Sequence, residues 1–336
     1  MSRGHRACGP TPDHRKPVMS HIFIYSPAGA VRDKAAFRRG VKRLTALGHA
    51  VEVDEAALAS HQRFAGDDAT RLAAIGRAAD SGADVALITR GGYGLTRILP
   101  ALPYKSITRS SERGMRWVGM SDFTALQLAV LARTGAVTWA GPALVGDLGT
   151  EDEPDDIMMA CLDDLLRGQG EGTGWRLPAE RRPKTPDSRA KSDLSAKGIE
   201  EKGIRNARLW GGNLSVLVSL LGTPFWPEVP GGILFLEDTN EHPYRIERML
   251  TQLLHAGVLG RQKAVLLGQF DPYRLVPHDR GFRLASVVDW LRQQIKAPVL
   301  TGLPYGHVPT KVLLPVGSTV DLVVQGREAL LVWGDV

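Results

Sequence analysis

The stretch GMSDFTALQLAVLAR, residues 119–133, decides the expected fold. Residues 117–118 before it read as the end of an apolar strand, and the run from residue 123 onwards reads as an amphipathic helix. A serine at such a strand-to-helix turn, here Ser121, exposes its hydroxyl at the edge of an α/β sheet and can act as a nucleophile. Serine and aspartate are also favoured helix N-caps, so the turn alone is compatible with a purely structural role.

Apolar strands and helical segments alternate along the first half of the chain. Strands are expected at residues 21–25, 50–53, 85–89 and 117–118, and helices at 34–47, 70–81 and from Ser121 onwards. This alternation predicts a parallel sheet with helices on both faces. In such sheets the ligand site lies beyond the carboxyl ends of the strands.

The second half predicts a separate mixed α/β unit. Strands are expected at 231–236, 263–268 and 298–301, a helix at 243–256, and a closing hairpin at 319–324 and 329–333. With 336 residues the length favours two domains. The expected division is a disordered leader at 1–20, an N-terminal α/β domain at 21–167, a partly disordered linker at 168–206 and a C-terminal α/β domain at 207–336.

Composition excludes several classes of protein. Hydrophobic residues make up 43% and charged residues 23%, close to the globular average. No apolar run is long enough to span a bilayer, and residues 1–20 lack the apolar stretch of a secretory signal, so a cytoplasmic protein without membrane partners is expected. The two cysteines, Cys8 and Cys161, have neither the number nor the spacing of a disulfide framework or a zinc site.

The formal net charge of +6 raises the question of nucleic-acid binding. The basic residues are spread along the chain, and their densest patches are the leader and residues 181–205. The latter segment has almost no apolar residues to bury, which is typical of a solvated linker. We therefore expect no nucleic-acid partner.

Polar residues with catalytic chemistry stand at the ends of three predicted strands: Ser121, Glu237 and His307. Serine catalysis needs an imidazole to accept the hydroxyl proton and a carboxylate to orient that imidazole. Each residue also has a structural interpretation, since Glu237 can cap the next helix and a lone histidine in a Gly-Pro loop is commonly a surface residue. Their joint placement at strand ends favours catalysis.

A glycine-rich turn, RGGYG at residues 90–94, directly follows the strand at 85–89. Glycines there permit positive φ and let backbone N–H groups approach a ligand, which suits an oxyanion hole or a phosphate cradle. The pattern is neither a Walker loop nor a dinucleotide fingerprint. A simple tight turn remains an equal interpretation of this motif alone.

Five motifs together resemble the LD-carboxypeptidase family, the muramoyl-tetrapeptide carboxypeptidases of peptidoglycan recycling. They are RGGYG at 90–94, GMSD at 119–122, WGGNL at 210–214, LED at 236–238 with YRIER at 244–248, and GLPYGH at 302–307. The resemblance runs from about residue 22 to near the C-terminus. It implies a flavodoxin-like N-terminal domain, a swivelling β/α C-terminal domain and a site in the cleft between them.

The resemblance also implies the site residues. Ser121 would be the nucleophile, His307 the general base and Glu237 its orienting acid, with an oxyanion hole made by the backbone N–H groups of Asp122 and Gly92. No metal or organic cofactor is implied. The further candidates for substrate contact are Gly91, Tyr93, Asn213, Tyr244 and Arg245, with packing favoured for Tyr244 and no arginine assigned to the substrate carboxylate.

Two features depart from the family pattern. The linker at 181–205 is longer and more charged than expected, and Gln127 stands at a helix position where many relatives are expected to have a histidine. Neither departure touches Ser121, Glu237 or His307.

The expected function is that of a cytoplasmic serine carboxypeptidase that releases the terminal D-alanine from murein tetrapeptide. The resemblance suggests a homodimer. An alternative within the family is a self-immunity peptidase that hydrolyses peptidyl-nucleotide antibiotics such as microcin C, with Trp210 either stacking a base or serving as a buried anchor. A non-enzymatic protein that closes on a small anion, and nucleic-acid binding through the linker, rank lower because neither explains the three polar strand ends.

Overall fold

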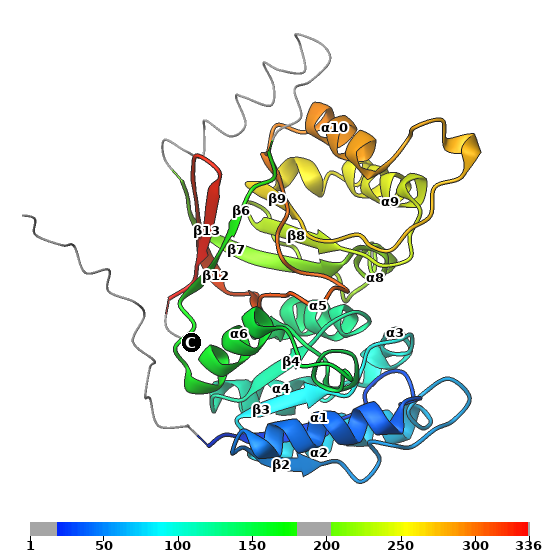
Figure 1. Cartoon of the computed structure of the whole chain (residues 1–336), viewed down its shortest axis with the longest axis vertical. Coiled ribbons are helices and arrows are strands. Elements are labelled where there is room, and N and C mark those ends of the chain that lie inside the picture. Colours follow the sequence, from blue (N-terminus) through cyan, green and yellow to red (C-terminus); the bar gives the residue numbers. More distant parts are fainter. Residues whose placement is uncertain (1–18, 180–202, 335–336) are drawn as a thin grey trace, which may run out of the picture.

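The computed structural model describes residues 19–179 and 203–334, which form two α/β domains stacked on each other (Figure 1). The predicted disorder of most of the leader and of the central linker segment lies outside the described residues. Helix α5, Phe123–Thr134, belongs to the first domain and contacts β7 and α8 of the second. Residues 123–131 of α5 are buried all round, as an apolar helix between two layers must be.

The first domain is built on a doubly wound sheet with the strand order β11-β5-β4-β3-β1-β2. Its strands are β1 His21–Tyr25, β2 Ala50–Val53, β3 Val85–Ile88, β4 Arg116–Gly119, β5 Thr138–Ala140 and β11 Leu314–Val316. All neighbours from β2 to β5 pair in parallel, in the order 2-1-3-4-5 of flavodoxin-like sheets. The predicted flavodoxin-like domain is confirmed.

Helices cover both faces of this sheet, as the alternation in sequence predicts. They are α1 Lys34–Ala46, α2 Asp68–Asp80, α3 Leu95–Ile98, η1 Leu99–Ala101, α4 Tyr104–Glu112, α5, η2 Leu144–Leu148 and α6 Asp156–Arg167. Ile22 and Ile24 of β1 pack with α1 and α6, whereas Phe23 and Tyr25 pack on the side of α2 and α5. Successive residues of a strand thus serve opposite cores.

The second domain contains a mixed sheet with the order β10-β9-β8-β7-β12-β13-β6. Its strands are β6 Gly172–Arg176, β7 Ile204–Asn213, β8 Ile233–Glu237, β9 Ala264–Leu267, β10 Val299–Thr301, β12 Thr319–Gln325 and β13 Glu328–Val332. Strands β7 to β10 are parallel and the others antiparallel. Its helices are α8 Leu214–Ser219, α9 Pro243–His255, η3 Leu259–Arg261, η4 Pro277–Asp279 and α10 Leu284–Gln294.

Two strands, β6 and β11, belong to sheets to which the predicted domain boundaries do not assign them. Strand β6 lies in the segment predicted as a linker and pairs with β13 of the second sheet, burying Thr173 and Trp175 on alternate positions. In the other direction, β11 follows the His307 loop and pairs with β5 at the edge of the first sheet. The chain therefore crosses between the domains near the predicted site.

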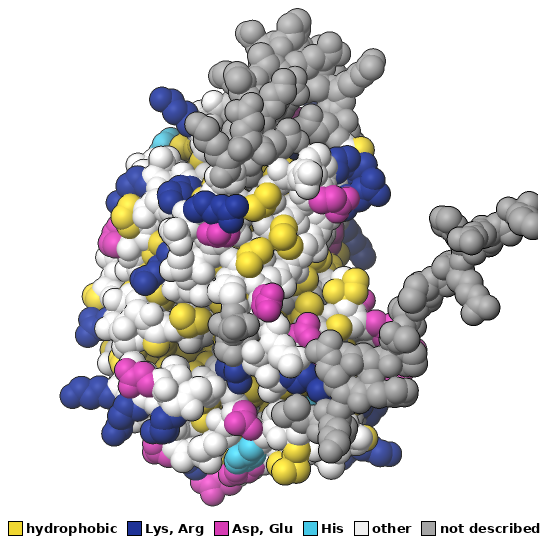
Figure 2. Space-filling model, turned by 90° about the vertical axis from the view of Figure 1, so that its left-hand side faces the viewer, with side chains coloured by type: hydrophobic (Ala, Val, Ile, Leu, Met, Phe, Trp, Pro, Cys, Tyr) yellow, Lys and Arg dark blue, Asp and Glu magenta, His cyan; other side chains and the backbone are white. Residues whose placement is uncertain are grey.

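The surface agrees with the interpretation of the charge. On the face in Figure 2, lysine and arginine side chains are scattered among acidic and apolar ones rather than gathered in one patch. Across the part of the chain that the structure describes, we find no helix with the length and apolarity needed to cross a bilayer.

Candidate active site

Ser121 lies on a tight turn between β4 and α5. Its φ is 64°, in the left-handed region that residues with a side chain seldom adopt. The N–H of Phe123 donates to the carbonyl of Met120 at 3.2 Å, and the N–H of Thr124 donates to the carbonyl of Ser121 at 3.0 Å. Such strain persists only where the surrounding structure enforces it, which is common at reactive positions.

The RGGYG turn packs directly on this serine. A Cβ placed on Gly91 would come within 2.6 Å of the Ser121 Cβ and 2.8 Å of its Oγ, so only glycine fits there. Gly92 has a φ of 93°, and the N–H of Gly29 donates to the Gly91 carbonyl at 3.2 Å. Gly92 lines the cavity together with Ser121, and Asp122 follows the serine in the chain.

The side chain of Asp122 ties the two turns together. Its Oδ2 accepts a hydrogen bond at 2.8 Å from the N–H of Leu95, at the start of α3. Burial raises the pKa of Asp122 to about 6, against the opposing effect of the backbone N–H groups of Leu95 and Gly94. This carboxylate fixes the glycine turn relative to the serine.

The second domain brings together the predicted acid and base. The Nδ1 of His307 and the Oε2 of Glu237 are 2.8 Å apart. Since a carboxylate accepts, Nδ1 carries the proton, and Nε2 is left as the acceptor. Glu237 is fully buried at the end of β8, and its Oε1 accepts from the Asn213 amide at 3.1 Å. Asn213, the register partner of Glu237 on β7, thus orients the acid.

The electrostatic environment of His307 has competing contributions. Burial lowers the pKa of this imidazole, whereas the hydrogen bond and the charge of Glu237 raise it. The Lys311 ammonium lowers it again and Asp238 raises it, and the net result is a pKa above the ordinary value. A basic imidazole of this kind suits proton transfer near neutral pH.

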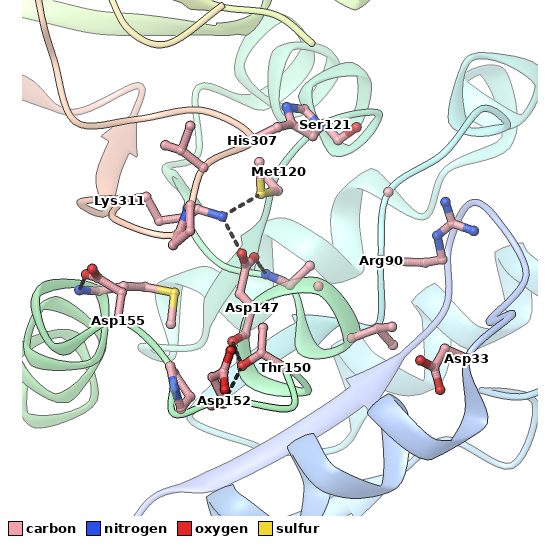
Figure 3. Close-up of a pocket in the computed structure, with 18 of the residues that line it drawn as sticks. Asp33, Arg90, Met120, Ser121, Asp147, Thr150, Asp152, Asp155, His307 and Lys311 are labelled. Atoms are coloured by element: carbon pink, nitrogen blue, oxygen red, sulfur yellow. Dashed lines mark hydrogen bonds and ion pairs between the residues drawn. The ribbon is translucent and has the colours of Figure 1, made fainter. Parts of the chain in front are cut away.

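Ser121 and His307 line the same cavity, of about 800 Å³, between the two domains (Figure 3). In the view of Figure 3 both side chains appear at one end of the cavity, with Arg90 on one wall and Asp147 and Asp152 on another. The volume suits a small peptide or a similar ligand. The Ser121 turn and the His307 loop therefore line one cavity.

A buried ion pair that the sequence did not single out crosses the domain interface in this cavity. Lys311, only 1% exposed, pairs with the carboxylate of Asp147 and lies 3.6 Å from the Met120 sulfur. The other oxygen of Asp147 accepts from the N–H of Ala143 at 2.8 Å. In the sequence, only the closeness of Lys311 to His307, four residues earlier, indicates that this lysine could lie at the site.

Several of the predicted contact residues lie elsewhere. Tyr93 is 49% exposed and packs near Phe64, Tyr244 is 54% exposed and packs on His242, and Arg245 pairs with Glu241 at 2.6 Å. None of these three predicted residues lines the cavity, whereas Gly91 and Gly92 do.

Two further positions raised by the sequence lie in the interior. Trp210 is a buried anchor whose Nε1 donates to Gln262 at 3.0 Å, not a platform in the cavity. Gln127 is buried in α5, and within the described residues neither of its amide atoms has a hydrogen-bond partner. Among residues 19–179 and 203–334, no group of three or more His, Cys, Asp or Glu side chains is placed to hold a metal ion.

Comparison with known proteins shows the family of the chain. The model of the LD-carboxypeptidase N-terminal domain matches residues 22–141, and that of the LD-carboxypeptidase C-terminal domain matches residues 206–322. A putative carboxypeptidase of Synechocystis is 31% identical over 306 residues, covering 90% of each chain. The chain belongs to the LD-carboxypeptidase family, as the resemblance implied.

Two other relatives represent the two activities considered from the sequence. The crystal structure of a muramoyltetrapeptide carboxypeptidase from Oxalobacter formigenes aligns with a TM-score of 0.79 and 34% identity, covering 94% of this chain and 99% of that one. The microcin C7 self-immunity protein of Escherichia coli is 28% identical over 238 residues, covering 68% of each chain.

Proposed function

We propose that this protein is a serine carboxypeptidase that hydrolyses the L,D amide bond before the terminal D-alanine of murein tetrapeptide. The observation that carries the proposal is the 2.8 Å contact between His307 and buried Glu237, in a cavity shared with the strained Ser121. Membership of the carboxypeptidase family gives the class of reaction. The muramoyltetrapeptide carboxypeptidase relative suggests the substrate.

The proposed first half-reaction forms an ester on Ser121. The Oγ passes its proton to Nε2 of His307 and attacks the carbonyl carbon of the scissile amide. The carbonyl oxygen becomes an oxyanion held by the N–H groups of Gly92 and Asp122. As the C–N bond breaks, His307 returns the proton to the departing amine of D-alanine.

Water completes the reaction by the same route in reverse. His307 takes a proton from the water as its oxygen attacks the ester carbonyl, and the proton then goes to the Oγ of Ser121 as the ester bond breaks. Glu237 stays ionised throughout and stabilises the imidazolium that forms twice in each cycle. Asn213 keeps this carboxylate aimed at Nδ1.

The nature of the cavity favours a peptide over a nucleotide. Among the described residues that line it there is no Phe, Tyr or Trp side chain on which a base could stack. Charged side chains of both signs are present instead, including Arg32, Arg90 and Asp152. Such walls suit a peptide with ammonium and carboxylate groups.

The test is mass spectrometry of L-Ala-γ-D-Glu-meso-diaminopimelate-D-Ala after incubation with the wild type, with Ser121→Ala and with Ser111→Ala. Ser111 lies on α4 away from the cavity and donates to the Ile107 carbonyl at 3.0 Å, so it is a matched control. Loss of one alanine is expected with the wild type and the control only. Since the proposed route uses only side chains, backbone N–H groups and water, EDTA is expected to leave the rate unchanged.

Two outcomes would redirect the proposal. No loss of alanine with the wild type, together with cleavage of an aminoacyl-nucleotide analogue, would favour the self-immunity reaction. Cleavage by Ser121→Ala at the wild-type rate would remove the serine mechanism. The cytoplasmic location and the homodimer stay predictions, and light scattering on the purified chain tests the latter.

A further inference from the structure

Arg90 is the basic residue that lies against the glycine turn at the nucleophile. It lines the cavity with Ser121 and His307, and Figure 3 shows its side chain on the wall opposite Lys311. Its Nη1 donates to the carbonyl of Ala30 at 3.1 Å. Its Nη2 lies 3.4 Å from the position that a Cβ on Gly92 would occupy. The guanidinium is thus held against the backbone of Gly92.

The charges around Arg90 favour an anionic ligand. Burial lowers the pKa of this guanidinium, and the nearby cations Arg32 and Arg63 lower it further. No ion pair joins Arg90 to a carboxylate among the described residues. Asp33 lines the same cavity, but its Oδ1 accepts from the N–H of Ala36 at 2.8 Å and caps α1.

The opposite wall is different, because there the buried cation already has its counter-ion. Lys311 pairs with Asp147, which leaves no net charge on that pair. Arg90 keeps most of its five N–H donors for a ligand, since one carbonyl is the only acceptor that the described residues give it. A planar fork of this kind matches the two oxygens of a carboxylate.

The chemistry of the proposed substrate places a carboxylate at the required distance. In a peptide with a free C-terminus, one nitrogen and one α-carbon separate the scissile carbonyl carbon from the terminal carboxylate, a span of roughly 4 Å by standard bond lengths. With the carbonyl oxygen at the N–H of Gly92, this carboxylate falls beside the same turn. We infer that Arg90 binds the terminal carboxylate of the leaving amino acid and so restricts cleavage to the last residue of the peptide, an inference that rests on the proposed function.

The test compares the tetrapeptide acid with its C-terminal amide, for the wild type, Arg90→Met and Arg97→Met. Because hydrogen bonds to a charged group are lost with the amide, the wild type is expected to prefer the acid by about 10- to 100-fold in kcat/KM. In Arg90→Met the acid is expected to lose this advantage, mainly through KM, so that kcat/KM falls by about 10- to 100-fold more on the acid than on the amide. Arg97, which pairs with Asp68 at 3.1 Å and does not line the cavity, is the control and should keep the preference.

The outcomes separate the inference from a structural role of Arg90. Equal losses on acid and amide in Arg90→Met would mean that the residue only holds the loop at Ala30, and would overturn the inference. A wild type that cleaves the acid but does not distinguish it from the amide would overturn it too. If the wild type cleaves neither peptide, the proposed function fails and the inference falls with it.

Discussion

The Ser121 turn and the His307 loop differ in what holds them in place. The turn is fixed by backbone geometry and close packing inside the first domain, with a φ of 64° and the backbone of Gly91 against the side chain. The loop is fixed at its reactive end by side-chain bonds, from His307 to Glu237, from Thr310 to Asp155 at 2.6 Å, and from Lys311 to Asp147. The last two reach across to the first domain.

This difference predicts different responses to mutation. The nucleophile is sensitive to added volume, because the space around it is filled by backbone that cannot move aside. The base is sensitive to lost charges and hydrogen bonds, because these set its orientation and its pKa. Variants of the Ser121 turn and of the His307 loop can therefore be tested separately.

Among variants that leave Ser121 and His307 in place, the largest effect is expected for Glu237→Gln, on the side of the loop. The amide removes the negative charge that selects the Nδ1–H tautomer and stabilises the imidazolium, so kcat should fall by roughly 10³- to 10⁴-fold. Because Glu237 raises the pKa of His307, the residual activity should rise with pH through a lower midpoint than in the wild type. Steady-state rates across pH check both points, with Glu228→Gln on the surface as the control. Wild-type rates in Glu237→Gln would contradict the role of this acid.

A smaller but still large effect is expected for Gly91→Ala, on the side of the turn. The added methyl group would meet the Ser121 Cβ at 2.6 Å and displace the oxyanion turn. Misplacement of one oxyanion donor typically lowers kcat by about 10²- to 10³-fold. Gly76→Ala in α2, where a Cβ meets nothing within 4 Å, controls for the exchange itself. An active Gly91→Ala enzyme with unchanged kcat would show that the turn can yield, and the comparison would fail.

The smallest effect is expected for the ion pair between the domains. Lys311→Met removes a cation that lowers the pKa of His307, so the rise of kcat/KM with pH should move to higher pH. Asp147→Asn leaves that cation without its partner, and the same rise should move to lower pH. A loss of about 10-fold in kcat/KM, or about 1.4 kcal/mol of transition-state stabilisation, is expected for each. Shifts in the same direction for both variants would point to general disturbance of the loop instead.

Much of this arrangement follows from the sequence because it depends on local chemistry. Apolar runs of β period predict the parallel strands, and Ser121, Glu237 and His307 stand next to them in the chain. The flavodoxin-like order and the family are confirmed. The sequence predicts that the glycines let backbone N–H groups approach a ligand. The structure adds that a larger residue at Gly91 would collide with Ser121.

What the sequence did not predict depends on contacts between distant segments. Strand β6 lies in a polar, Gly- and Pro-rich region, so its sequence alone does not predict a strand. Its strand conformation depends on pairing with β13. Lys311 and Asp147 are 164 positions apart, so no local pattern joins them. Tyr244 and Arg245 follow Glu237 closely, yet the start of α9 directs both away from the cavity.

The most direct test of the central claim measures whether the turn and the loop act as one unit. Ser121→Ala, His307→Ala and the double variant are compared in kcat on the tetrapeptide. Each single variant should lose roughly 10⁴- to 10⁶-fold, and the double variant should be no slower than the slower single one, because residues that act together in one step have non-additive effects. Losses that multiply in the double variant would mean that Ser121 and His307 act separately, and would contradict the account.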